Sequence, residues 1–198
     1  MNAVIATNSV ELNVGQTPSK GVVAMFCLII AECAIFTIFV VAYLYYIGKS
    51  LSGPTPQQVL ELPILNTICL LSSSATITFA VRSLRSGDTK RFSYWWLATI
   101  ALGAYFLLGT GREWHRLIYE RGLTIQTNLF GTTFYSLVGL HASHVVVGLI
   151  ALVIVMAFAT RGVVKQEHSQ RVHVLSLYWH FVDVVWIVVF TVVYIIGR

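Results

Sequence analysis

Residues 130–160 read FGTTFYSLVGLHASHVVVGLIALVIVMAFAT and contain no Asp, Glu, Lys or Arg. A helix needs about 20 mostly apolar residues to cross the hydrocarbon core of a bilayer. Because this uncharged run is longer than that, it predicts a helix that spans a membrane and continues into the interface.

The whole 198-residue chain has the same apolar character. Its residues are 57% hydrophobic and only 11% charged. Soluble domains carry about 25% charged residues, so the composition excludes a soluble enzyme and a secreted disulfide scaffold. The net charge of +5 is spread along the chain without a basic cluster, which argues against a nucleic-acid partner. The composition therefore predicts an all-α integral membrane protein.

Four further apolar runs predict five transmembrane helices in one bundle. These runs cover residues 22–47, 64–81, 92–111 and 172–197, and residues 130–160 supply the fourth span in chain order. Residues 1–20 carry no pattern of a cleaved signal peptide and are expected to form a cytoplasmic tail. With no internal repeat and no long linker, residues 21–198 are expected to form one transmembrane domain.

The distribution of Lys and Arg predicts the orientation. With five spans, eight of the 13 basic residues fall on the side of the N-terminus, and four of these eight lie in the short loop at 82–91. Cytoplasmic loops carry an excess of Lys and Arg. The N-terminus is therefore expected in the cytoplasm and the C-terminus on the opposite side.

Five ionisable side chains lie deep in the expected spans: Glu32, His141, His144, His180 and Asp183. An acid at the centre of a bilayer costs about 2.5–3.5 kcal/mol on insertion scales, so neither acid is expected to face lipid. Because burial penalises charged forms, the favoured arrangement is a neutral or proton-sharing pair of acid and imidazole. His141 and His144 are three residues apart, as are His180 and Asp183, so each pair shares a helix face and the two faces are expected to meet in one hydrogen-bonded polar core.

Small and aromatic residues near these positions predict helix packing. Gly139 and Ser143 are four residues apart and form a small-residue surface on which another helix can approach closely. Gly148 follows His141 by seven residues and shares the helix face of His141 and His144. Trp179 and Trp186 flank the acid of the fifth span and are expected to pack against a partner helix rather than a cofactor.

The residues alone leave several roles open for the polar set. They can pin helices together, take part in a proton-linked or lipid-linked function, or bind a metal or haem, with one histidine from each of the last two spans as axial ligands of a b-type cytochrome. Metal sites usually recruit more convergent ligands, so no metal site is expected. A small proton-coupled transporter using Glu32 and Asp183 is a further alternative, against which stands the absence of a repeat.

Other polar or reactive residues have simpler interpretations. Cys27, Cys33 and Cys69 lie in apolar runs and are expected to be small buried hydrophobic residues. Glu113 and His115, close to the end of the third span, are expected to contact water or lipid headgroups.

Three motifs match those of a known family: GTTF at 131–134, GLHASHVVVG at 139–148 and YWHFVDVVW at 178–186. Weaker matches precede them in the same order, including Glu32 in an apolar first span and GREW at 111–114. With these motifs, the chain resembles subunit III of the haem-copper respiratory oxidases from about residue 21 to its end. The family usually has seven spans, and the resemblance is to the last five, as in a short bacterial form.

The resemblance implies an accessory subunit, in a bacterial inner membrane with a periplasmic C-terminus, that binds no cofactor of its own. Its implied partners are catalytic subunit I, which carries the haems and copper that reduce O2 to water while protons are pumped, subunit II, and structural phospholipids. The electron donor is cytochrome c or a quinol. The implied role is to sustain proton uptake and to protect the catalytic subunit from inactivation.

The resemblance also implies roles for particular residues. Glu32 is the buried carboxylate, the histidines and aspartate of the last two spans form the polar core, and Arg161 and Glu32 are candidates for lipid binding. The chain departs from the family at Val81 and Arg82, where the family has paired histidines, and at His173, where it has a glutamate.

Overall fold

The computed structural model describes residues 19–50 and 52–197, and these residues form helices joined by short connections. Five helical segments are long and apolar enough to cross a membrane. These helices are α1 Lys20–Tyr46, α3 Ile64–Arg85, α4 Thr89–Tyr119, α5 Leu129–Thr160 and α6 Ser169–Phe190. Helix α6 continues as the π-helical segment η2 Thr191–Ile196. The two short elements are α2 Pro56–Val59 and η1 Gln166–His168. The prediction of an all-α, five-helix membrane protein is confirmed. Residues 1–18 of the expected tail at 1–20 lie outside the described residues. Lys20, its last residue, already begins α1.

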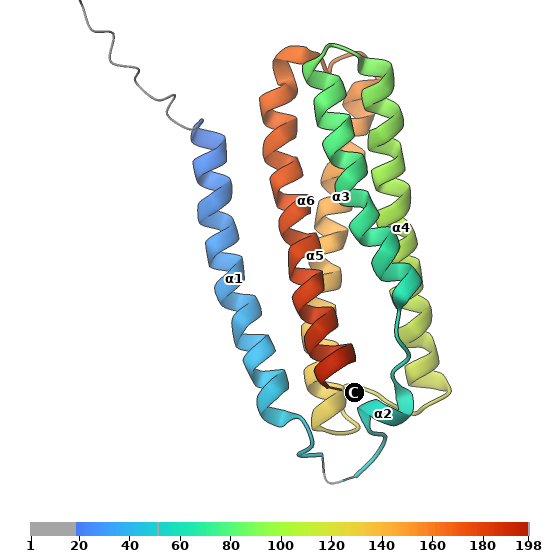
Figure 1. Cartoon of the computed structure of the whole chain (residues 1–198). Coiled ribbons are helices and arrows are strands. Elements are labelled where there is room, and N and C mark those ends of the chain that lie inside the picture. Colours follow the sequence, from blue (N-terminus) through green and yellow to red (C-terminus); the bar gives the residue numbers. More distant parts are fainter. Residues whose placement is uncertain (1–18, 51, 198) are drawn as a thin grey trace, which may run out of the picture.

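Four of the long helices form a closed ring, and the fifth lies against its side. Helix α3 packs on α4, α4 on α5, α5 on α6, and α6 on α3, whereas α1 packs mainly along α5, α6 and η2. Figure 1 shows α1 at the edge of the bundle. Only Phe36 and Tyr43 of α1 are buried, so most of this helix faces outward.

Side-chain caps fix where two of the long helices begin. The Asp88 side chain accepts a hydrogen bond from the Arg91 backbone N–H at the start of α4, and the Asn128 side chain accepts one from the Gly131 N–H at the start of α5. Such caps pair backbone donors that have no partner in the first helical turn. Gly87, with a φ of +82°, makes the tight turn between α3 and α4, a conformation that glycine adopts without steric cost.

Three tryptophans join the helices of the ring through their indole N–H groups. Trp96 donates to the Leu152 carbonyl at 2.9 Å, which joins α4 to α5. Trp179 donates to Ser73 Oγ at 2.8 Å and Trp186 to Thr67 Oγ1 at 3.1 Å, and both join α6 to α3. Each tryptophan thus contributes a large apolar surface and satisfies its one polar atom inside the bundle.

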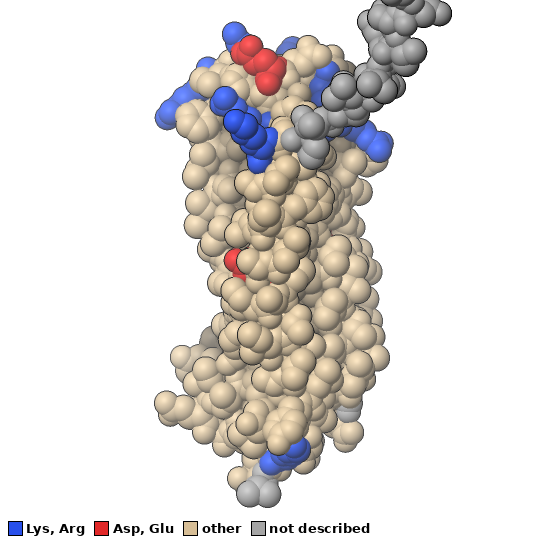
Figure 2. Space-filling view, turned by 90° about the vertical axis from the view of Figure 1, so that its left-hand side faces the viewer, with Lys and Arg blue, Asp and Glu red and all other residues tan. Residues whose placement is uncertain are grey.

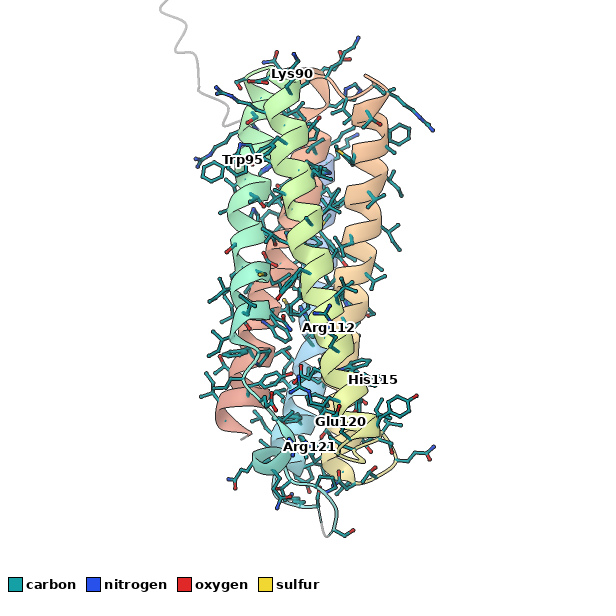
Figure 3. The ribbon with its side chains drawn as sticks, turned by 90° about the vertical axis from the view of Figure 1, so that its right-hand side faces the viewer. Lys90, Trp95, Arg112, His115, Glu120 and Arg121 are labelled. Carbon is teal, nitrogen blue, oxygen red and sulfur yellow. The ribbon has the colours of Figure 1, made fainter. Side chains whose placement is uncertain are left out.

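Charged residues gather at the two ends of the bundle. The middle of the face seen in Figure 2 is almost free of charge, and its Lys and Arg side chains lie towards the ends. Figure 3 shows Lys90 near one end of α4, and Arg112, Glu120 and Arg121 towards the other. This distribution matches a multi-pass membrane protein with an apolar belt between two polar surfaces.

Candidate functional site

The acid of the first span, Glu32 on α1, is half-buried and pairs with His144 on α5. The Nε2 atom of His144 lies 3.0 Å from Glu32 Oε2, and its Nδ1 atom lies 2.8 Å from the Leu140 carbonyl oxygen. The exposed fractions of these side chains are 22% for Glu32 and 13% for His144, so the pair is largely withdrawn from the surface. It lies at the edge of a groove of about 280 Å³ that Leu28, Ser143, Val147 and Tyr178 also line.

The contacts of this pair indicate which atoms donate and which accept. A carbonyl oxygen only accepts, so Nδ1 of His144 carries a hydrogen. The contact between Nε2 and the Glu32 carboxyl group then needs one further proton, held either by the imidazolium or by the carboxylic acid. The pair therefore brings an acid and an imidazole to hydrogen-bonding distance across α1 and α5.

The acid of the fifth span, Asp183 on α6, belongs to a different cluster. The Ser74 hydroxyl of α3 donates to Asp183 Oδ2 and lies 3.0 Å from His180 Nδ1. Thr78 Oγ1 lies 3.4 Å from the other ring nitrogen of His180. The other carboxyl oxygen of Asp183 is buried and has no hydrogen-bond partner among the described residues. The cluster joins α3 to α6 through polar side chains.

His141 is isolated from both clusters. It is fully buried, and neither ring nitrogen has a hydrogen-bond partner in the described part of the chain. Its ring lies between Phe106 and Trp186, with centroid distances of 5.8 Å and 4.9 Å. The expectation of one hydrogen-bonded polar core is therefore wrong. His144 contacts α1, His180 and Asp183 contact α3, and His141 lies among aromatic rings.

We expect the His141→Phe variant to be as stable as the natural protein or more stable. An unpaired polar group in an apolar interior costs about 1–3 kcal/mol, and phenylalanine removes that cost while it keeps an aromatic ring against Phe106 and Trp186. The measurement is the thermal unfolding midpoint in detergent. His144→Phe is the control, because it breaks the contact with Glu32 and should lower the midpoint. A lower midpoint for His141→Phe would show that His141 has a polar partner.

The predicted packing residues lie at close helix contacts, with one exception. A Cβ atom on Gly148 would lie 2.9 Å from the Trp179 ring, and one on Gly139 would lie 3.4 Å from the Trp114 ring. Trp179 and Trp186 are both buried in this chain's own bundle. Ser143 is exposed beside the Glu32 groove, so its packing against another helix stays a prediction.

Comparison with known proteins decides the family. The sequence model of the family described as Cytochrome c oxidase subunit III matches residues 14–198. The chain belongs to this family. It is 34% identical to Cytochrome c oxidase subunit 3 of a Bacillus species, strain PS3, over 84% of this chain and 81% of that protein. It is 37% identical to Cytochrome bo(3) ubiquinol oxidase subunit 3 of Pseudomonas aeruginosa (85% and 81%) and to Cytochrome c oxidase subunit 3 of Synechocystis (90% and 77%).

In this subunit III chain, no group of three or more His, Cys, Asp or Glu among residues 19–50 and 52–197 is placed to hold a metal ion. The three cysteines are free, but Cys27 and Cys33 are exposed on α1 and Cys69 is half-buried. The expected burial of Cys27 and Cys33 is wrong because α1 lies outside the ring of helices, and Cys69 on α3 is only partly buried. Arg161 is exposed at the end of α5, where its role in lipid binding stays a prediction.

The sequence interpretation missed the role of Glu113. Helix α4 continues to Tyr119, beyond the expected end at 111. The Tyr194 hydroxyl in η2 lies 3.0 Å from both carboxyl oxygens of half-buried Glu113, a contact that the sequence did not indicate. Glu113 also lines an open pocket, so its expected contact with water or lipid headgroups stays a prediction, and His115 is exposed as expected. Residue spacing along α4 contained a signal for the inward orientation of Glu113. The apolar residues Phe106 and Leu117, both buried, lie seven residues before and four residues after it on the same helix face.

Proposed function

We propose that this chain is the accessory subunit III of a haem-copper terminal oxidase and supports proton uptake by the catalytic subunit while O2 is reduced to water. Its relatives support this proposal, since they are named as subunit 3 of cytochrome c oxidases and of a bo(3) ubiquinol oxidase. The proposal covers both electron donors. Haem and copper belong to the catalytic subunit, and this chain supplies a protein and lipid environment beside it.

The pair of Glu32 and His144 is the observation that carries the proposal. Ionisable residues inside a membrane commonly mark proton relays. This pair lines a groove at the outer edge of the bundle. A proton on the pair is therefore closer to a neighbouring subunit or lipid than a proton on the cluster between α3 and α6. We infer that the α3–α6 cluster of Asp183 and His180 has a secondary, mainly structural, role.

The proposed setting is a bacterial inner membrane, with a cytoplasmic N-terminus and a periplasmic C-terminus. Support comes from one end of the bundle, which carries Lys20, Arg82, Arg85, Lys90, Arg91, Arg161, Lys165 and Arg171. Cytoplasmic surfaces of membrane proteins are enriched in such residues. Arg161 and the groove at Glu32 are the proposed contacts for phospholipid, and subunits I and II are the proposed protein partners.

We expect the Glu32→Gln variant to keep most of the initial oxidase activity and to shorten the active lifetime several-fold. Glutamine cannot share a proton with the imidazole of His144, although it keeps the size of the side chain. The measurement is oxygen consumption followed to inactivation, across a range of pH. His144→Ala should give the same result, and Glu167→Gln, an exposed acid at the basic end, is the matched control. Unchanged lifetime and pH profile in the first two variants would reduce the pair to helix packing.

A purification experiment tests the accessory role directly. The chain carries a tag, the protein is extracted in mild detergent, and absorption spectra and oxygen consumption are recorded before and after this chain is stripped away. Haem that stays with the remaining subunits supports the proposal. Haem that stays with this chain alone would favour a b-type cytochrome instead.

A further inference from the structure

A polar pocket of about 200 Å³ lies at the end of the bundle opposite the basic loops. Glu61, in the segment between α2 and α3, and Asn66 of α3 form one wall, and Glu113 and Arg116 of α4 form the other. Asn66 lies directly against Gly109 of α4, where any side chain would collide with it. The pocket therefore depends on a close approach between α3 and α4, and it is separate from the Glu32 groove.

The Glu113 carboxyl group has more acceptor capacity than the protein uses. Two carboxylate oxygens offer about four acceptor sites. In the described chain, only the Tyr194 hydroxyl donates to Glu113, and one hydroxyl supplies a single hydrogen. A ligand with several N–H donors, such as a primary ammonium group, would fill the remaining sites from the pocket side.

A positively charged side chain, Arg116, lines the same pocket as Glu113. Arg116 Nη1 is 2.5 Å from Glu61 Oε2, and the side chain of Arg116 is still 44% exposed. A guanidinium group has five N–H donors, so this ion pair leaves some of them for an anionic oxygen. Acceptors at Glu113 and donors at Arg116 together complement a ligand that has both an ammonium and a phosphate group.

An apolar surface continues from the pocket toward the middle of the membrane. Ile64, Leu65 and Ile68 on α3 are all exposed, and the first two also line the pocket. Acyl chains can lie along such a surface while their headgroup stays at the interface. A purely soluble amine would make no use of it.

We propose that this pocket binds the headgroup of an ethanolamine phospholipid, with its ammonium on Glu113, its phosphate on Arg116 and an acyl chain along Ile64, Leu65 and Ile68. The site needs only this chain, so it does not rest on the proton-uptake role of the Glu32 pair. It also gives a reason for an acidic residue at this depth of α4.

The test is native mass spectrometry of the full tagged chain, purified with the subunits that accompany it, delipidated and titrated with three lipids of identical acyl chains. Phosphatidylethanolamine donates N–H bonds, phosphatidylcholine carries the charge without N–H donors, and phosphatidylglycerol has no ammonium. We expect affinity for the ethanolamine lipid to exceed that for the glycerol lipid about ten-fold, with the choline lipid between them. Water-soluble phosphoethanolamine serves as the probe for a free amine.

Two variants and one matched control assign the site. Glu113→Gln should abolish the preference for ethanolamine and leave phosphatidylglycerol binding unchanged. Arg116→Gln should weaken all three lipids, and Glu120→Gln, an exposed acid at the same end of α4 that does not line the pocket, should change nothing. An unchanged preference in Glu113→Gln, or phosphoethanolamine binding as tight as that of the lipid, would overturn the proposal. A cross-link between Glu113 and a lysine of another subunit would overturn it as well.

Discussion

The Gly148→Leu variant is expected to lose the contact between α5 and α6 and to be the least stable of the variants considered. A single Cβ atom at Gly148 would lie 2.9 Å from two carbons of the Trp179 ring. Trp179 has little room to move away, because Gly103 of α4 lies against the opposite edge of its ring. A Cβ atom added at Gly103 would lie only 2.8 Å from that edge. Overpacking of a well-filled interior costs about 1–3 kcal/mol, and a leucine against a clamped indole should cost at least the upper value.

The measurement is the thermal unfolding midpoint, together with the yield of chain that co-purifies with its partners. Gly111→Leu is the matched control, since nothing lies within 4 Å of a Cβ at this α4 glycine. It should leave the midpoint unchanged. The effect should partly reverse when Gly148→Leu is combined with Trp179→Phe, because phenylalanine is smaller than the indole that the leucine meets. Equal midpoints for Gly148→Leu and Gly111→Leu would contradict the prediction.

The Asp183→Ala variant is expected to destabilise the contact between α3 and α6 by about 1–3 kcal/mol, because it leaves the Ser74 hydroxyl without its acceptor in a partly buried site. Asp183→Asn should remain within about 1 kcal/mol of the natural protein, since its amide oxygen can still accept from Ser74. Unfolding midpoints in detergent measure both.

Two serines of α3 provide a matched comparison for this cluster. Ser74→Ala should reproduce part of the loss, because it removes the hydroxyl that bonds Asp183 and His180. Ser72→Ala should have no effect, because exposed Ser72 bonds only to a carbonyl of its own helix. If Asp183→Asn were as damaging as Asp183→Ala, the negative charge rather than the hydrogen bond would stabilise the bundle.

The two acids of the spans therefore differ in what surrounds them. Asp183 is 3% exposed and accepts from the Ser74 hydroxyl of a helix inside the ring, whereas Glu32 lies on the outer helix, 3.0 Å from His144 Nε2. A proton at Asp183 would have to cross packed side chains to leave. This contrast is the reason that proton-uptake experiments should begin with Glu32 and stability experiments with Asp183.

The amino-acid sequence by itself determined the membrane class and the number of spans, and it identified the ionisable residues within α1, α5 and α6 but not the contact of Glu113 in α4. Each of these depends on local composition, because an apolar run of sufficient length must form a helix in lipid whatever its neighbours are. The specific motifs at 131–134, 139–148 and 178–186 also indicated the family correctly.

Only the tertiary structure decided which polar groups meet. Residue spacing shows that His141 and His144 share a face of α5, but a face about 100° wide can touch two neighbours, and here His144 reaches α1 while His141 lies between Phe106 and Trp186. The pairing of Glu113 with Tyr194 likewise joins residues 81 positions apart. Such pairings depend on the order of helices around the bundle, which periodicity within one helix does not contain.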